Sequence, residues 1–180
     1  MILGLDVSSS VIGLSIIENK KLIHIDYFDL KADDKLSDNQ VYAKIKQWLI
    51  NVKNNYKIDK IRIEEPIKKC SNGKTSINVL AVIFKVNFTV CWMCYDVFGF
   101  DIEYLGSSTA RKKLKINIKN ELTKDFKYYA STKDIKKRVL ERVIEIFPEF
   151  EKKLTYSKNG FIESHLLDIA DAVVMAYYQF

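Results

Sequence analysis

The order of elements expected along the chain predicts an α/β fold, built on a mixed five-stranded sheet with helices on both faces. Three apolar runs over residues 2–30 are joined by short polar turns, which is typical of three antiparallel strands. Strand-like runs then alternate with segments of helical periodicity, which favours further strands added in parallel. We expect one domain over residues 1–180, since this length provides a sizeable core.

The first half of the chain holds four of the five expected strands. After a charged segment, Ser37 or Asp38 is expected to cap a helix that ends near Asn55, because apolar residues recur there at helical spacing. Pro66 ends the fourth strand, since proline cannot donate a hydrogen bond to a sheet. The predicted strands cover residues 2–7, 11–18, 22–30 and 58–64.

A long apolar helix is predicted over residues 75–97. It is hydrophobic on nearly every face, which predicts wide burial, either in the core or against another subunit. Lys85 and Asp96 interrupt its apolar run, so we expect no segment that spans a membrane. Cys91 and Cys94 lie within it, and we interpret them as small core residues because the chain has no second cysteine pair for a zinc site.

The last third of the chain is basic and mostly helical. The net charge is +6, and lysine and arginine gather between residues 112 and 138. Such a cluster is either a solvated face or a surface that binds phosphate groups. The expected elements are a strand over residues 100–105, a basic segment capped by Ser107 or Ser108, a helix from Ser131 or Thr132 to about Phe147, a charged loop over 150–160 and a final helix over 163–178.

Four acidic residues stand out by their surroundings. Asp6 ends the first strand, and Glu64 ends the fourth, which the mixed sheet places beside the first. Asp168 and Asp171 share one face of the otherwise apolar last helix, together with His165. A buried carboxylate is costly unless a cation meets it, and like charges on one packed face repel each other. The pattern therefore predicts a bound cation.

Four converging carboxylates would form an oxygen-rich site of the kind that Mg²⁺ or Mn²⁺ prefers. Two such ions about 4 Å apart can hold an attacking water and a leaving phosphate oxygen while a phosphodiester is hydrolysed. Taken singly, each acid also has an ordinary structural explanation, as a turn residue or part of a solvated stripe. Their joint occurrence favours a two-metal site formed by Asp6, Glu64, Asp168 and Asp171.

Three short blocks of sequence resemble the motif blocks of RuvC-like Holliday junction resolvases, which belong to the ribonuclease H-like superfamily. They are GLDVSSSVIGL at residues 4–14, IEE at 63–65 and DIADA at 168–172. Each block is short, but their order and spacing extend over almost the whole chain. The resemblance implies a hydrolase of DNA recombination and repair, a homodimer with two Mg²⁺ or Mn²⁺ ions per active site that cuts four-way or branched DNA. A cytoplasmic location is expected from the lack of a basic signal-peptide region, and a cellular, phage or other viral source stays open.

The resemblance also implies roles for the acids. Asp6 would bridge the metal ions, and Asp168 and Asp171 would be the paired acids of the last helix. Glu64 matches the family's glutamate better than Glu65, because strand alternation places Glu64 and Glu65 on opposite faces of the sheet. Glu65 stays a close competitor.

Basic residues after the fifth strand and before the next helix occupy places that the family also uses. They would contact DNA phosphates or stabilise charge that develops during cleavage, and Lys133 is also assigned to the catalytic group. The helix over 75–97 matches the position of the family's dimer helix. The aromatic wedge of some relatives is missing here, and the role of His165, as ligand, base or packing residue, stays open. The expected DNA contacts are Arg111, Lys112, Lys113, Lys133 and Lys74.

Other interpretations stay open. A ribonuclease H-type enzyme that cuts RNA–DNA hybrids and a non-catalytic nucleic-acid-binding protein would share the fold. The run GLDVSSS also resembles the first turn of actin-like sugar kinases, although 180 residues are too few for the two domains of that fold. In the nuclease interpretation, the serine-rich turn and Gly13 would let the backbone approach a substrate phosphate.

Overall fold

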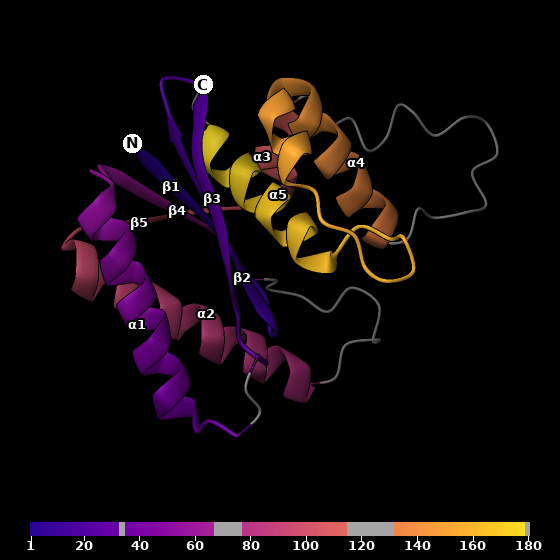
Figure 1. Ribbon diagram of the computed structural model, residues 1–180. Coiled ribbons are helices and arrows are strands. Elements are labelled where there is room, and N and C mark those ends of the chain that lie inside the picture. The colour runs from indigo at the N-terminus through magenta and orange to yellow at the C-terminus, as the bar shows by residue number, and fades with distance from the viewer. Residues whose placement is uncertain (33–34, 67–76, 115–131, 179–180) are drawn as a thin grey trace.

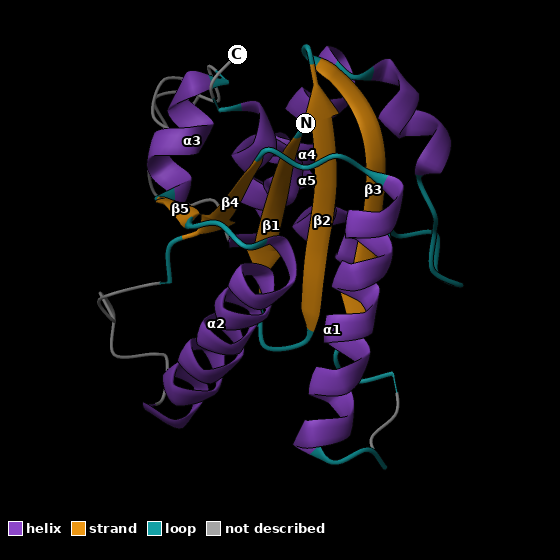
Figure 2. Ribbon diagram, turned by 90° about the vertical axis from the view of Figure 1, so that its left-hand side faces the viewer, coloured by secondary structure: helices purple, strands orange, loops and turns teal. Residues whose placement is uncertain are grey.

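A mixed five-stranded sheet forms the centre of the protein (Figure 2). The computed structural model describes residues 1–32, 35–66, 77–114 and 132–178, with only the backbone for 132–134. The parallel pairs are β1 with β4 and β4 with β5, and the other pairs are antiparallel. This confirms the predicted meander followed by parallel strands. In sheet order, the strands are β3 (Lys21–Asp29), β2 (Val11–Glu18), β1 (Ile2–Val7), β4 (Lys60–Glu64) and β5 (Ile102–Leu105).

Helices cover both faces of the sheet, as predicted (Figure 1). One face carries α1 (Asp38–Asn55) and α2 (Ile77–Phe98), and the other carries α3 (Ser107–Lys113), α4 (Thr132–Ile146), the 3₁₀ helix η1 (Pro148–Lys153) and α5 (Ser164–Tyr177). The last helix, α5, packs directly on β1 and β2, and α4 packs against α5 in turn.

Strand alternation gives the two faces of the sheet different chemistry. On the side of α1 and α2, β1 contributes Leu3 and Leu5 to an apolar cluster with side chains of β2 and β4. On the side of α5, the same strand presents Gly4 and Asp6. The face under α5 therefore combines glycine and polar residues with its hydrophobic contacts.

Helix α5 lies unusually close to the sheet at β1. A Cβ atom added to Gly4 would lie 2.2 Å from the carbonyl oxygen of Ala172, so only glycine fits there. The hydroxyl of Ser15 on β2 donates a 2.9 Å hydrogen bond to the same carbonyl. These contacts hold the acidic face of α5 against the ends of the central strands.

The structure confirms one predicted helix cap and corrects two other predictions about where elements begin. Ser37 caps α1 in a capping box with Gln40, as one of the two alternatives foresaw. Ser107 and Ser108, however, lie inside α3, and its N-cap is Gly106. The expected charged loop over 150–160 begins instead within η1, because Phe150 is fully buried and anchors that segment in the core.

Helix α2 is buried on one side only. Val90 and Cys94 are fully buried, whereas Phe88 and Trp92 expose 64% and 60% of their surface. Burial in the core alone is therefore the wrong explanation for its apolar composition. By length and composition α2 could cross a membrane, although one of its faces packs in the core.

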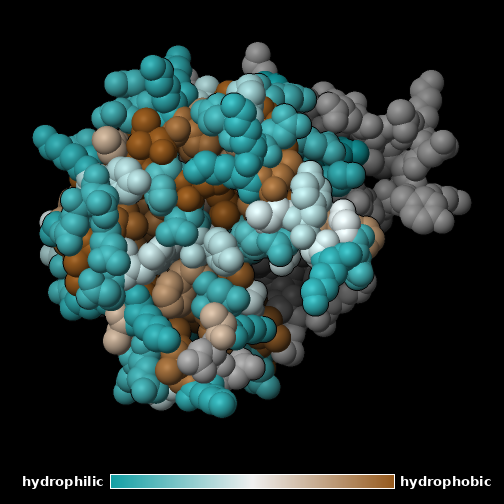
Figure 3. All heavy atoms as spheres, in the orientation of Figure 1, coloured by the Kyte–Doolittle hydropathy of each residue, from teal (hydrophilic) through white to brown (hydrophobic). Residues whose placement is uncertain are grey.

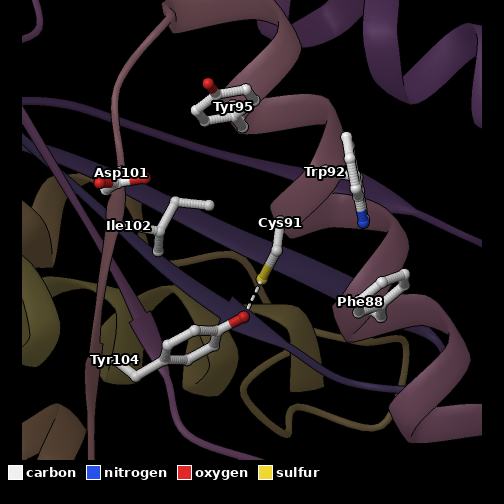
Figure 4. Close-up of a pocket in the computed structure, with 7 residues that line it drawn as sticks. All are labelled: Phe88, Cys91, Trp92, Tyr95, Asp101, Ile102 and Tyr104. Carbon is white, nitrogen blue, oxygen red and sulfur yellow. Dashed lines mark hydrogen bonds between the residues drawn. The ribbon is translucent and has the colours of Figure 1, made fainter.

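The two cysteines of α2 are free thiols that lie in the apolar core, as interpreted from the sequence. Burial raises the pKa of both thiols, which keeps them protonated and unreactive. The phenol of Tyr104 lies 2.9 Å from the sulfur of Cys91, at the back of a cavity of about 410 Å³ between α2 and β5 (Figure 4). Trp92 and Tyr95 line the same cavity from α2.

Candidate active site

Asp6 and Glu64 lie side by side at the ends of two neighbouring parallel strands. Leu5 on β1 is in register with Ile63 on β4, so the next residue of each strand brings the two carboxyl groups together. The Glu64 carboxyl is within hydrogen-bonding reach of Asp6. Glu65 lines a separate pocket on the α2 side of the sheet. The structure therefore brings Glu64, and not Glu65, to Asp6.

Asp168 reaches the same point from α5, and Gly13 explains how. Gly13 on β2 is the register partner of Asp6. A Cβ atom at Gly13 would lie 2.5 Å from both the carbonyl carbon and the carbonyl oxygen of Asp168. The missing side chain thus admits the backbone of α5 directly beside Asp6. The space expected to admit a substrate phosphate at Gly13 is occupied by this helix.

Lys136 on α4 places a cation among three of the acids. Its ammonium nitrogen lies 3.5 Å from Oδ2 of Asp6 and 3.4 Å from Oδ2 of Asp171. It also donates a hydrogen bond to Oδ1 of Asp168. A single ammonium group therefore joins acids from β1 and α5 to helix α4.

Arg111 on α3 supplies a second cation. Its Nη2 and Nε atoms donate hydrogen bonds of 2.8 Å and 3.3 Å to Oδ1 of Asp171. The Asp171 side chain is fully buried, and its other oxygen, Oδ2, accepts no hydrogen bond within the part of the chain that the structure describes. The ammonium of Lys136 lies 3.4 Å from Oδ2, within ion-pair distance but without a hydrogen-bonding arrangement.

The acids and cations shift one another's protonation. Burial and the neighbouring Glu64 carboxyl raise the pKa of Asp6 well above its ordinary value, although Lys136 acts in the opposite direction. Burial lowers the pKa of Lys136, but the carboxylates of Asp6, Asp171 and Asp168 outweigh burial and raise it overall. The site is thus an acidic cluster whose charge the two basic side chains offset only in part.

These residues fit a divalent cation in the type of their donors. All four acids offer oxygen, one oxygen of Asp171 is buried without a hydrogen bond, and a cation already lies between three of the carboxylates. Among the described residues, no group of three or more such side chains is arranged as a ready metal site. Asp6, Glu64, Asp168 and Asp171 could hold a metal once the ammonium group moves.

The predicted DNA contacts lie in different surroundings. Arg111 is bound to Asp171, whereas Lys112 and Lys113 are exposed on the same short helix. Lys74 lies outside the described residues. Lys133 lies in α4, but its side chain is outside the described part. All of these contacts stay predictions.

Lys136 is the residue of this cluster that sequence reasoning passed over in favour of Lys133. The sequence does indicate that Lys136 faces inward, because it lies three and four residues before the buried Val139 and Leu140, on the apolar side of α4. A lysine at such a position needs an acidic partner. The sequence could not indicate which acids would meet it.

His165 packs against an aromatic side chain of β3. Its ring stacks on Tyr27 of β3, with centroids 4.0 Å apart and planes inclined by 17°. Its Nε2 atom lies 3.9 Å from a carboxylate oxygen of Glu163. This placement favours packing over metal binding among the alternatives for His165.

The mixed five-stranded sheet with helices on both faces is an α/β fold of the ribonuclease H-like type. The structure is similar to Thermus thermophilus RuvC solved in complex with a Holliday junction substrate, with a TM-score of 0.63 and 13% identity over 98% of this chain and 90% of that one. A further structure of T. thermophilus RuvC gives a TM-score of 0.59 at 14% identity, over 98% and 91% of the two chains.

The yeast mitochondrial Holliday junction resolvase is also similar, with a TM-score of 0.59 and 14% identity over 98% of this chain and 76% of that one. No protein-family model matches the sequence, and no curated protein matches it. The likeness at such low identity establishes the fold. It confirms the resemblance to RuvC-like resolvases at that level.

Proposed function

We propose that the protein is a metal-dependent endonuclease that hydrolyses phosphodiesters at four-way or branched DNA junctions. The observation that carries this proposal is the convergence of four acids on one end of the sheet, although they come from three elements that are far apart in the sequence. These acids are Asp6 on β1, Glu64 on β4, and Asp168 and Asp171 on α5. The shared fold with a RuvC bound to a Holliday junction supports the choice of substrate.

The four acids would hold two Mg²⁺ or Mn²⁺ ions. When bound, such ions supply positive charge that stabilises the attacking and leaving oxygens of an in-line displacement. Arg111 fixes the orientation of the buried Asp171 carboxylate through two hydrogen bonds to one of its oxygens. The close packing of α5 at Gly13 fixes Asp168 relative to Asp6. The chain thus preorganises its oxygen donors before substrate binds.

The substrate would lie across the open side of this cluster. Lys112 and Lys113 are exposed on α3, the helix that also carries Arg111 into the site, so they are suited to phosphate contacts. Hydrophilic side chains predominate on the face of the molecule in Figure 3, with smaller hydrophobic patches between them. We include Lys74 and Lys133 among the proposed DNA contacts, as the sequence pattern indicates.

We further propose a homodimer that forms through α2. Phe88, Trp92 and Tyr95 expose more than half of their surface on the side of α2 that faces away from the core (Figure 4). A four-way junction has two-fold symmetry, so a symmetric dimer would present two equivalent sites to it. The opposite face of α2 packs on the core, which supports a protein partner over a lipid one. A cytoplasmic location belongs to the same proposal.

Cleavage of defined nucleic acids tests this function. The protein is incubated with a four-way DNA junction, a linear duplex and an RNA–DNA hybrid, each with Mg²⁺ and with a chelator. We expect Mg²⁺-dependent cutting of the junction. Preferential cutting of the hybrid would indicate a ribonuclease H-type enzyme, and junction binding without cleavage under any condition would indicate a non-catalytic protein.

A pair of variants separates the acid site from general charge effects. Asp6→Asn should reduce cleavage by more than about 100-fold, since even outer partners of metal ligands are worth 10–100-fold. Its junction binding should stay close to that of the original protein. Asp59→Asn, at an exposed acid paired with the terminal amine where β1 begins, at the opposite end of the strand from Asp6, should retain activity. Full activity of Asp6→Asn would refute the mechanism.

A further inference from the structure

The position of Lys136 raises a question about how metal would enter the site. Its ammonium group lies within 3.5 Å of carboxylate oxygens of Asp6 and Asp171 and donates a hydrogen bond to Asp168. The same three side chains are among the proposed metal ligands. An ammonium nitrogen and a metal ion cannot occupy the centre of these oxygens together.

Charge balance explains why a lysine stands there. Four acidic side chains meet only two basic ones, Lys136 and Arg111, in a largely buried site. Without the ammonium group, three acids would repel one another at close range, which destabilises the fold. Lys136 therefore does for the metal-free protein what a divalent cation would do for the loaded one.

Of the two cations, Lys136 is the one built to move. Arg111 holds a single oxygen through two of its nitrogen atoms, and its side chain is 14% exposed. Lys136 ends a flexible four-carbon chain and is 25% exposed, so its amine can turn to solvent while α4 stays in place.

We propose that Lys136 is an internal counter-ion that occupies the metal position in the metal-free protein and is displaced when a divalent cation binds. This inference rests on the proposed metal-dependent function and adds a regulatory step to it. Metal affinity is set by competition with the side chain, and the acidic cluster has a counter-ion in both states.

Amine labelling of the intact protein tests the displacement directly. The chain is treated with an amine-acetylating reagent in chelator and in Mn²⁺, and modification at each lysine is followed by mass spectrometry. Modification of Lys136 should be slow in chelator and should rise several-fold with Mn²⁺. Lys137, the exposed neighbour on α4, should react equally in both conditions. The Asp6→Asn variant should lose the response at Lys136.

A substitution tests the competition independently. Lys136→Gln should bind Mn²⁺ about tenfold more tightly by calorimetry, because the competing cation is gone. It should also melt at a lower temperature in chelator and gain more from Mn²⁺ than the original protein does. Lys137→Gln should change neither property. If Lys136→Gln is poorly folded, the labelling measurement on the unsubstituted chain still decides.

The outcomes separate this inference from the function on which it rests. Mn²⁺ binding to the unsubstituted protein with unchanged labelling of Lys136, or with weaker binding by folded Lys136→Gln, would overturn the counter-ion role alone. Failure of the unsubstituted protein to bind Mn²⁺ at all would overturn the metal-dependent function and this inference with it.

Discussion

Gly13 offers the sharpest test of how the fold builds the site, through the substitution Gly13→Ala. The added Cβ would lie 2.5 Å from the backbone of Asp168, whereas ordinary contacts begin at 3.4 Å. Helix α5 would have to retreat by about 1 Å, since both partners are backbone atoms in regular structure. Overpacking of this kind costs about 1–3 kcal/mol, and a displacement of about 1 Å at a catalytic group costs about 100-fold in rate.

Thermal unfolding and junction cleavage measure the two effects of Gly13→Ala separately. We expect the melting temperature to fall by about 2–4 °C for each kcal/mol lost. Cleavage at a temperature where the variant is folded should fall by about two orders of magnitude. Gly106→Ala is the control, because the nearest atom to its added Cβ is the Thr109 hydroxyl oxygen at 3.8 Å. Gly13→Ala with unchanged melting and unchanged cleavage would refute the argument that this glycine sets the position of Asp168.

Three further predictions follow from other parts of the structure. Asp6→Asn should raise the melting temperature in chelator near neutral pH. Burial and the Glu64 carboxyl raise the pKa of Asp6 in the folded protein. The contribution of Asp6 to the free energy of unfolding is therefore fully present below the ordinary pKa of an aspartate and is lost as the pH rises through the raised pKa. In melting curves recorded at a series of pH values, this rise in melting temperature should shrink toward about pH 4. A lower melting temperature of Asp6→Asn than of the original protein at neutral pH would contradict the prediction. Glu103→Ala leaves the guanidinium of Arg62 buried without its carboxylate and should lower the free energy of unfolding in urea by about 3 kcal/mol. Lys60→Ala removes the more exposed partner of Glu103 and should cost less than about 1 kcal/mol. Equal losses would show that burial of Arg62 is not the cause. In light scattering, Trp92→Glu should convert the dimer to a monomer that keeps the circular dichroism spectrum of the folded protein. A persistent dimer would exclude the exposed face of α2 as the interface.

Local pattern was enough to predict the sheet and the acids. Successive side chains of a strand alternate between the two faces of the sheet, and helices cover both faces of β1, α1 and α2 on one side and α5 on the other. The strand therefore reads as a continuous apolar run in the sequence. An acid that ends such a strand, as Asp6 does, is conspicuous for the same reason. The same alternation placed Glu64 and Glu65 on opposite faces, as the structure has them.

The partial burial of α2 could not be predicted from its composition. An apolar residue such as Trp92 looks alike in sequence whether it faces the core or a partner. The face that turns inward is decided by the helix and strands packed against it. The sequence therefore could not indicate which side chains of α2 face the core.

The sequence by itself indicated the strands, the α-helices and the four acids, because each depends on neighbours within a turn or a strand. The tertiary structure alone decided which cations meet those acids. Lys136 lies 130 residues from Asp6 along the chain, and Gly13 is next to Asp168 only because α5 crosses β2 there. Electrostatic and steric complementarity between distant segments is a property of packing, and no local pattern records it.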